Sequence, residues 1–230
     1  MSVTSQVDLS RLPALPRGGV GDTADRIREL IRESILRGDL PEGVRLNADH
    51  LGRHLGVSHI PLREAIRALA ADGWVLLRPH QGAFVRSRSQ QELADLFELR
   101  AQVEPYSAEL AAQRRSAEQL SIMEAVVTEQ ERTADPIEFA RLNAEFHSAV
   151  GEASQNALLA AHVRSLNART RFYFSAVATA RHARSVEEHR TIVAAIRRRA
   201  DAQVRELVRE HVLQTQDELD HVTRESRPPE

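Results

Sequence analysis

The chain has 230 residues, of which 42% are hydrophobic, 28% charged and 4% aromatic, and its formal net charge at pH 7 is −2. This balance is ordinary for a soluble globular protein and excludes a chain that is basic throughout. The chain has no cysteine, which excludes disulfides and thiolate metal sites; because it also shows no secretory signal and no apolar run long enough to span a bilayer, we expect a cytoplasmic protein without a membrane partner.

Residue usage favours helices over sheets. Leu, Ala, Val, Glu and Arg dominate a chain that is poor in aromatics, so we expect a mainly α protein. All 31 basic residues are arginine. Residues 1–86 hold 12 Arg against 10 Asp and Glu, a balance of +2, whereas the rest holds 19 against 23, a balance of −4. The positive N-terminal part permits an anion-binding domain there.

The N-terminal 21 residues differ from the rest of the chain. Residues 1–21 contain several prolines and glycines and no sustained periodicity, which predicts a mobile tail outside the fold. Beyond them, apolar residues recur at helical spacing until Gly38, which predicts a first amphipathic helix. Asp22 or Thr23 is placed to cap its start.

Two further helices are predicted around a tight turn. A short helix fits residues 48–54, and Gly56 comes next at a place where a left-handed residue commonly ends a helix. Ser58 is placed to cap a third helix, which runs to about Asp72. Pro61 lies within its first turn, where a missing N–H group costs little.

The outward face of this third helix carries basic groups, and a hairpin comes after it. His59, Arg63 and Arg67 are spaced four apart and therefore line one face. Residues 74–85 alternate in polarity and contain glycine at a turn, which predicts a two-stranded hairpin. Three helices and a hairpin form a winged helix-turn-helix, which we assign to residues 22–86.

The C-terminal part is predicted to be all α. After a linker at residues 87–89, residues 90–223 show helical spacing and no strand signal, and residues 224–230 form a tail. The breaks in the pattern divide this part into a six-helix bundle. The predicted helices are 90–114, 116–133, 136–152, 156–179, 184–199 and 201–223.

Four stretches carry a family resemblance. The chain reads GVRLNADHLGRHLGVSHIPLREAIRALAADGWVLLRPHQGAFV over residues 43–85, FHSAV over 146–150, EEHRTIVAAI over 187–196 and REHV over 209–212. The first stretch resembles the DNA-binding domain of the GntR family of bacterial transcription regulators. The other three resemble the FCD effector domain of its FadR-type subfamily, and six helices are most similar to the VanR-type branch.

The resemblance implies how such a protein works. It implies a homodimer in which each winged helix reads half of a palindromic double-stranded DNA operator. It also implies that the helical domain binds a small metabolite, often a carboxylate, around a metal ion. We therefore expect a metabolite-responsive regulator, a repressor that is released by its effector.

The DNA contacts are expected from the third helix and the hairpin. Arginine can donate two hydrogen bonds to guanine O6 and N7, and a helix start can hold a phosphate. By resemblance, Arg63 is the strongest contact, and Gly82 marks the tip of the wing. The remaining residues assigned to the DNA interface are Arg53, Ser58, His59, Pro61 and Arg67. For Arg67, an ordinary solvated helix face is an equal alternative.

His59 departs from the family pattern, which has arginine at this position. Histidine is neutral in much of its population at pH 7, so one fixed charge per half-site is missing. His59 can still donate a hydrogen bond to a base. We expect an operator sequence that differs from those of relatives.

The resemblance also implies the metal ligands. They are Asn143, His147, His189 and His211, and the first two lie four residues apart, on one helix face. Imidazole ligands favour zinc or nickel among the divalent ions. The three other histidines of the helical part, His162, His182 and His221, are interpreted as ordinary structural or solvent-facing residues.

The charge of this ligand set favours an anionic effector. Asn143 stands where aspartate is commoner in the family, and a neutral amide and three neutral imidazoles cancel none of the charge of a divalent ion. Arg100 is placed to bind the effector's carboxylate. An equally plausible role for Arg100 is an ion pair with Glu104, one helical turn later.

The alternative to a regulator is a helical-bundle metalloenzyme with an accessory DNA-binding domain. Three histidines and an open coordination position also describe catalytic zinc sites, which need a general base. Glu145 and Glu188 adjoin the ligand histidines in sequence, but helix geometry predicts that they point away from the ion. We therefore expect no enzymatic activity and no catalytic residues.

Overall fold

The computed structural model describes residues 12–15, 22–87, 89–175 and 177–225, and side chains up to residue 221. The chain divides into two compact units, Met1–Arg88 and Ser89–Glu230. Most of the two predicted tails, 1–21 and 224–230, lies outside the described residues. Leu12 is described and is buried, and its carbonyl oxygen lies 3.2 Å from Nε2 of His54. At Leu12 the chain therefore packs against the N-terminal unit, contrary to the expectation of a tail outside the fold.

The N-terminal unit is the predicted winged helix-turn-helix. The expected hairpin is present, and a third strand that was not predicted joins it; β1 has two residues, too few to show an alternating pattern. The sheet is antiparallel in the order β1-β3-β2, with Arg45 opposite Phe84 and Arg78 opposite Gly82. The elements are α1 (Thr23–Leu36), β1 (Arg45–Leu46), α2 (Ala48–Leu55), α3 (His59–Ala71), β2 (Val75–Arg78) and β3 (Gly82–Val85).

Local signals set the ends of these helices. The Asp22 side chain accepts a hydrogen bond from the Asp25 backbone N–H at 2.8 Å and so caps α1. Gly56 ends α2 with φ of 65°, in the left-handed region where glycine is unstrained. Ser58 occupies the N-cap position of α3, but its side chain makes no capping hydrogen bond. The core of the unit is apolar, with Ile31, Leu62 and Trp74 fully buried.

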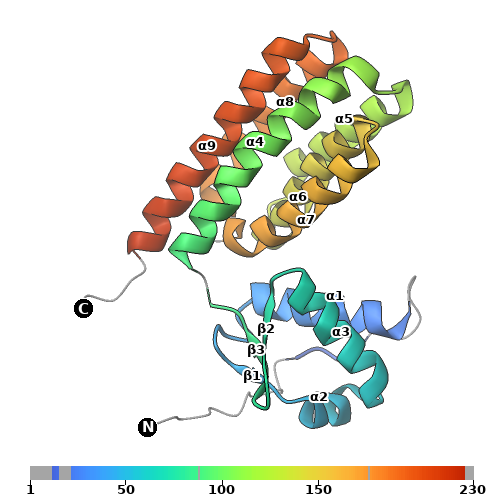
Figure 1. Ribbon diagram of the computed structural model, residues 1–230, viewed down its shortest axis with the longest axis vertical. Helices are drawn as coiled ribbons and strands as arrows, with labels where there is room; N and C mark the ends of the chain where they lie inside the picture. The colour runs from blue at the N-terminus through green and yellow to red at the C-terminus, as the bar shows by residue number, and fades with distance from the viewer. Residues whose placement is uncertain (1–11, 16–21, 88, 176, 226–230) are drawn as a thin grey trace. The chain divides into compact units, whose positions relative to one another are not determined.

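In the residues that the structure describes, the second unit contains six helices, labelled α4 to α9 in Figure 1. The longest two, α4 and α9, lie side by side, and α6 packs between α5 and α7. The elements are α4 (Gln90–Arg114), α5 (Ala117–Arg132), α6 (Pro136–Ala153), α7 (Ala157–Phe174), α8 (Ala178–Arg197) and α9 (Asp201–Glu225). Among the described residues, no helix is both long enough and apolar enough to cross a membrane.

The break between α7 and α8 was predicted wrongly. The expected helices ended at residue 179 and began again at 184, whereas α7 ends at Phe174 and α8 begins at Ala178. His182, at the expected break, lies inside α8 and packs on the Phe139 ring at 4.5 Å between centroids. Packing of this kind determines the boundary, and local spacing does not report it.

The core of the helical unit contains a polar centre. Phe97, Phe139, Phe146 and Phe174 are buried and fill the bundle. Within this apolar surrounding lie several fully buried polar side chains, a costly arrangement unless they are hydrogen-bonded or bind a ligand. The buried polar residues of this region include Arg100, Glu104, Gln130, Asn143, His147, Arg181, His189 and His211.

Candidate functional site

Three of the predicted ligands meet inside the helical unit. His147 of α6, His189 of α8 and His211 of α9 are 3%, 0% and 2% exposed, and their ligand atoms lie within 4.8 Å of one another. Nε2 of His147 and Nε2 of His211 are 3.2 Å apart. Three helices that are far apart in sequence thus bring three imidazole nitrogens to one point, as the sequence predicted.

Each imidazole has a hydrogen-bond acceptor behind it. Nδ1 of His147 lies 2.9 Å from Oε2 of Glu104, and Nδ1 of His189 lies 2.8 Å from Oε1 of Gln130. These acceptors come from α4 and α5. Nδ1 of His211 lies 2.6 Å from Oε2 of Glu188, on α8. A ring that donates from Nδ1 presents the lone pair of Nε2, so these acceptors fix the tautomer that can bind a metal.

The electrostatics of the centre favour the neutral forms of His189 and His211. Burial lowers the pKa of His211 to about 4, although the hydrogen bond and charge of Glu188 oppose this shift. Burial, with a smaller effect from the neighbouring histidines, also lowers the pKa of His189. For Glu104, burial raises the pKa, but Arg100 and His147 together bring it well below its usual value. At neutral pH, His189 and His211 are therefore uncharged and Glu104 is ionised.

Two buried polar atoms near the centre lack hydrogen-bond partners among the described residues, and a metal ion would satisfy them. Nε2 of His189 and Oδ1 of Asn143 are buried and have no hydrogen-bond partner among the described residues. Asn143 lies one turn before His147 on α6, so the two side chains share a face. Buried polar atoms without partners are costly, and coordination of a cation would satisfy both. A donor set of three imidazoles and one amide oxygen suits a divalent ion such as zinc or nickel.

Arg100 forms the ion pair with Glu104 that was one of its two predicted roles. Its Nε and Nη2 donate to the carboxylate of Glu104 at 2.6 and 3.2 Å, in the i to i+4 ion pair. The Arg100 side chain is 1% exposed, and its Nη1 has no partner in the described part of the chain. A small cavity of about 10 Å³ lies beside His147 and is bounded by Glu104 and Ser107, whose hydroxyl also lacks a partner there.

Glu188 corrects one expectation. Helix geometry predicted that Glu188 points away from the ligands, because it is adjacent to His189. In the structure, its carboxylate reaches His211 on α9. It lies on the Nδ1 side of that ring, behind the ligand atom, where it cannot act as a base toward the ion. Glu145 pairs with Arg141 at 2.5 Å on the surface, as expected of a solvated face.

The sequence did not identify the acceptors. Glu104 was predicted only as a partner of Arg100, and nothing in the local pattern singled out Gln130. Its signal is a polar residue at a core position of α5, since Gln130 is fully buried. Glu188 was considered only as a neighbour of His189 on the same helix, and its contact with His211 was not foreseen. Each of the three acceptors lies on a different helix from the histidine that it contacts, and local spacing cannot show such a contact.

A groove in the N-terminal unit lies between α3 and the wing. It has a volume of about 640 Å³, and it includes two predicted residues, Arg63 and Gly82. Three basic or protonatable groups that were not predicted also line it, namely Arg45, Arg78 and His80. Arg45 belongs to β1, the strand that was not predicted; Arg78 ends β2, and His80 lies in the turn of the hairpin. Asp49 also lines the groove, so three arginines face one carboxylate and the lining is net positive.

Glycine is required at position 82. Its φ is +106°, a conformation in which a side chain is strained. A Cβ atom there would also lie 3.3 Å from Nε of Arg45. Gly82 therefore leaves room for the Arg45 side chain of β1, which is a structural reason for glycine at this position.

The other predicted DNA contacts lie outside this groove. Nδ1 of His59 is 3.5 Å from Oδ1 of Asp49, and both side chains are largely exposed. Arg67 is exposed on α3, one turn after Arg63, and Nε of Arg53 donates to the Asp49 backbone carbonyl at 3.3 Å. Ser58 is exposed and Pro61 half-buried at the start of α3.

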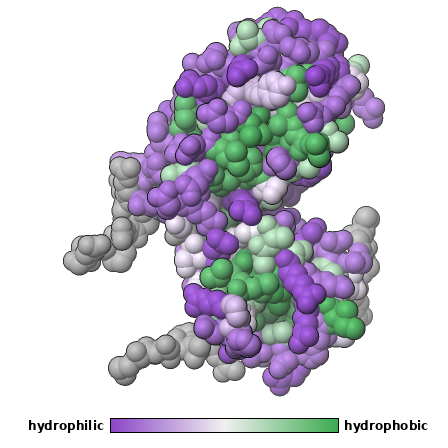
Figure 2. All heavy atoms as spheres, in the orientation of Figure 1, coloured by the Kyte–Doolittle hydropathy of each residue, from purple (hydrophilic) through white to green (hydrophobic). Residues whose placement is uncertain are grey.

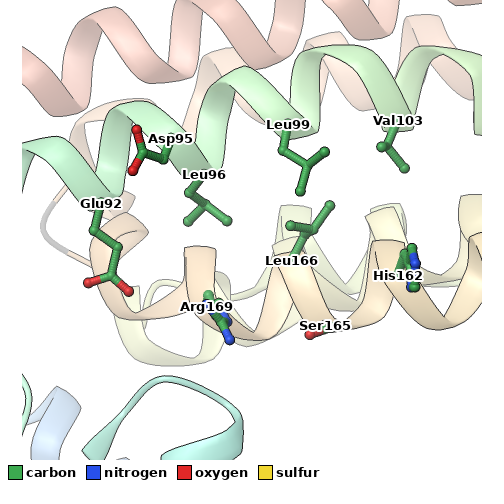
Figure 3. Close-up of a pocket in the computed structure, with 9 residues that line it drawn as sticks. All are labelled: Glu92, Asp95, Leu96, Leu99, Val103, His162, Ser165, Leu166 and Arg169. Atoms are coloured by element: carbon green, nitrogen blue, oxygen red, sulfur yellow. The ribbon is translucent and has the colours of Figure 1, made fainter. Parts of the chain in front are cut away.

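An apolar groove also runs along the surface of the helical unit, between α4 and α7. It measures about 470 Å³, and Figure 3 shows Leu99 and Val103 of α4 pointing toward Leu166 of α7. Charged residues lie at its edges, including Glu92 and Arg169. Figure 2 shows apolar side chains gathered on this side of the unit. The large apolar residues exposed on these two helices are Leu99 (50%), Tyr106 (45%) and Leu158 (79%).

Two family descriptions match the chain. The description "Bacterial regulatory proteins, gntR family" matches residues 23–85, and "FCD domain" matches residues 95–214. The two matches fall within the two compact units.

Individual proteins are similar over one or both units. The "Nta operon transcriptional regulator" of Aminobacter aminovorans is 35% identical over 56% of this chain, but the chain spans only 63% of that protein. The "HTH-type transcriptional repressor GlaR" of Escherichia coli is 30% identical over 80% of this chain and 89% of its own length. Among solved structures, E. coli McbR/YncC matches 90% of this chain and all of its own with a TM-score of 0.70; at 16% identity this likeness shows the fold alone.

Proposed function

The chain belongs to the GntR family of bacterial regulatory proteins and carries an FCD domain, and we propose that it represses transcription until a small carboxylate binds its metal centre. It is a DNA-binding transcription regulator, not an enzyme. The observation that carries the proposal is the convergence of His147, His189 and His211, each with an acceptor behind its ring. Metal-ligating histidines characteristically donate their other ring N–H to such an acceptor.

Four residues of the chain would hold the ion. His147, His189 and His211 offer their Nε2 atoms, and Asn143 offers an amide oxygen. When bound, a divalent ion supplies two positive charges and open coordination positions. Because Glu104 is paired with Arg100 and Glu188 with Arg181, the nearby carboxylates do not neutralise those charges. This balance favours an anionic effector.

Arg100 is the residue we assign to the effector's carboxylate. Arg100 is buried and donates to Glu104, and Glu104 in turn accepts a hydrogen bond from His147. Among the described residues its Nη1 has no partner, which leaves one donor for an anion, and the Ser107 hydroxyl beside the small cavity is a second such donor. A ligand there would press on α4, the helix next to the linker at residues 87–89. A shift of α4 is the route by which we propose that effector binding reaches the DNA-binding unit.

The N-terminal unit would read DNA through its groove. Arg63 lies on the exposed face of α3, where it can reach guanine in the major groove, and Arg45 and Arg78 add charge for phosphates. Gly82 lets the wing approach closely. Five further residues keep their proposed roles, either as contacts to the DNA backbone or as residues that shape the start of α3: Arg53, Ser58, His59, Pro61 and Arg67.

A homodimer would bring two such units to a palindromic site. The apolar groove between α4 and α7, with Leu99 at its centre, supports dimerisation through the helical unit, since an isolated apolar face of this kind is commonly an interaction surface.

The experiment that tests the function combines metal and carboxylates. Full-length protein is screened by thermal shift against carboxylic acids, with zinc or nickel and after metal removal, and hits are tested for release of the selected operator. We expect stabilisation by an acid only when the metal is present, and loss of that response in Arg100→Lys with metal still bound. Operator release that needs neither metal nor any acid would refute the proposal.

A further inference from the structure

Two of the three ligand histidines are connected through a glutamate to a buried arginine. Arg100 holds Glu104, which accepts from His147, and Arg181 holds Glu188, which accepts from His211. The guanidinium of Arg181 is completely buried. The proposed mechanism uses Arg100, but it leaves Arg181 without a role. A buried arginine is costly unless its charge is paired, so its contacts are informative.

Arg181 uses three of its nitrogen atoms to hold two helices. Its Nη2 donates to Glu188 at 2.7 Å on α8, and its Nη1 donates to Glu218 at 2.8 Å on α9. Its Nε lies 3.3 Å from the Ser185 hydroxyl. A planar guanidinium can serve both carboxylates at once, whereas a single ammonium cannot do so with the same geometry.

The position of Glu188 shows why it needs to be held. Its side chain is 20% exposed, so an unpaired carboxylate could turn toward water. His211 would then lose the acceptor that keeps the proton on Nδ1 and the lone pair on Nε2. Glu218 lies seven residues, two helical turns, after His211 on the same side of α9. Arg181 therefore contacts α9 directly at Glu218 and indirectly at His211.

We infer that Arg181 is a positioning residue of the metal centre: by holding Glu188, it fixes the ring of His211. This inference rests on the proposed metal centre. Removal of a group that orients a ligand typically weakens metal binding by about 10- to 100-fold.

The chain offers a matched control. Arg184 also donates to Glu218, at 2.6 Å, but it is 62% exposed, and no hydrogen bond from it to Glu188 is seen among the described residues. Arg181→Gln and Arg184→Gln therefore each remove a hydrogen bond to the Glu218 carboxylate. Only Arg181→Gln also removes a hydrogen bond to Glu188. Metal-free full-length proteins are titrated with cobalt(II), and both the dissociation constant and the visible spectrum of the bound ion are recorded.

We expect Arg181→Gln to bind cobalt about 10- to 100-fold more weakly with an altered spectrum, and Arg184→Gln to match the wild type. Arg181→Lys should fall between them, and it replaces the glutamine variant if that does not fold. In a Glu188→Gln background, Arg181→Gln should add no further loss, because both substitutions act on His211 through one contact.

The possible results separate this inference from the metal centre itself. Unchanged cobalt affinity and spectrum in the Arg181 variants, or a fully additive loss in the double variant, overturns the inference alone. Wild-type protein that binds cobalt no better than His211→Ala overturns the metal centre, and the inference with it.

Discussion

Nε2 of His147 and Nε2 of His211 face each other at 3.2 Å, although the two residues lie on different helices and 64 positions apart. Behind them, Glu104 and Glu188 accept hydrogen bonds from the opposite nitrogen of each ring. Two unprotonated nitrogens at this distance repel each other, and two protonated ones would do so more strongly. One shared proton, or a cation between the two nitrogens, would remove this repulsion. A cation would also give a partner to Nε2 of His189, which is buried and has no hydrogen-bond partner among the described residues.

Removal of a ligand should abolish metal binding. We expect His147→Ala and His189→Ala to be purified without stoichiometric metal and to lose the thermal stabilisation that zinc or nickel gives the wild type. That stabilisation is about 2.7 kcal/mol when the free ion is at 100 times its Kd. Metal content and melting temperature are measured together. His162→Ala, which changes an exposed histidine of the α4/α7 groove, should keep its metal; full occupancy in both ligand variants would place the site elsewhere.

Operator binding should depend on Arg63. Arg63→Ala should cost about 1 to 3 kcal/mol of binding free energy on an operator selected from random duplexes, because a bidentate contact to guanine is lost. Affinity is measured by fluorescence anisotropy at fixed salt. Arg37→Ala, which removes another exposed arginine of the unit from outside the groove, serves as the control. If the two variants bind equally well, Arg63 does not read the operator.

The wing should be sensitive to a side chain at Gly82. Gly82→Ala places a side chain at φ of +106° and within 3.3 Å of Arg45, so it should destabilise the N-terminal unit by about 1 to 3 kcal/mol. Denaturant unfolding monitored by the fluorescence of Trp74, the chain's one tryptophan, reports on this unit. Gln81→Ala, at the neighbouring exposed position, should be close to neutral. A midpoint for Gly82→Ala equal to that of the wild type would contradict the strain we describe.

Dimerisation should depend on the groove between α4 and α7. Leu99→Glu introduces a charge into this apolar face and should shift the protein from dimer to monomer, because a buried unpaired carboxylate is costly. Ile122→Glu on α5 is the control, since Ile122 and Leu99 are exposed to a similar degree, 47% and 50%. Light scattering on full-length protein gives the mass. A monomeric wild type, or a Leu99→Glu variant that remains dimeric, would exclude this surface as the interface.

Much of the architecture is specified by local patterns. Apolar residues at helical spacing predicted the helices of both units, and cap residues such as Asp22 and Gly56 predicted helix ends. The spacing failed between α7 and α8, where no glycine or proline marks the end of a helix. It also failed for β1, whose two residues pair with β3 rather than with a neighbour in sequence. Local propensity is weak in such places, so packing decides.

The same division holds for the candidate site. The three histidines were predicted from the resemblance of three stretches of the chain to the FCD domain. The ion pair of Arg100 with Glu104 was one of two roles predicted for Arg100, because the two residues are one helical turn apart. The acceptor behind each ring depends on tertiary structure. Gln130 reaches His189 across 59 residues, and Arg181 reaches Glu218 across 37. These contacts join side chains on different helices, and the register of one helix against another is fixed by packing in the whole bundle, which no local spacing records.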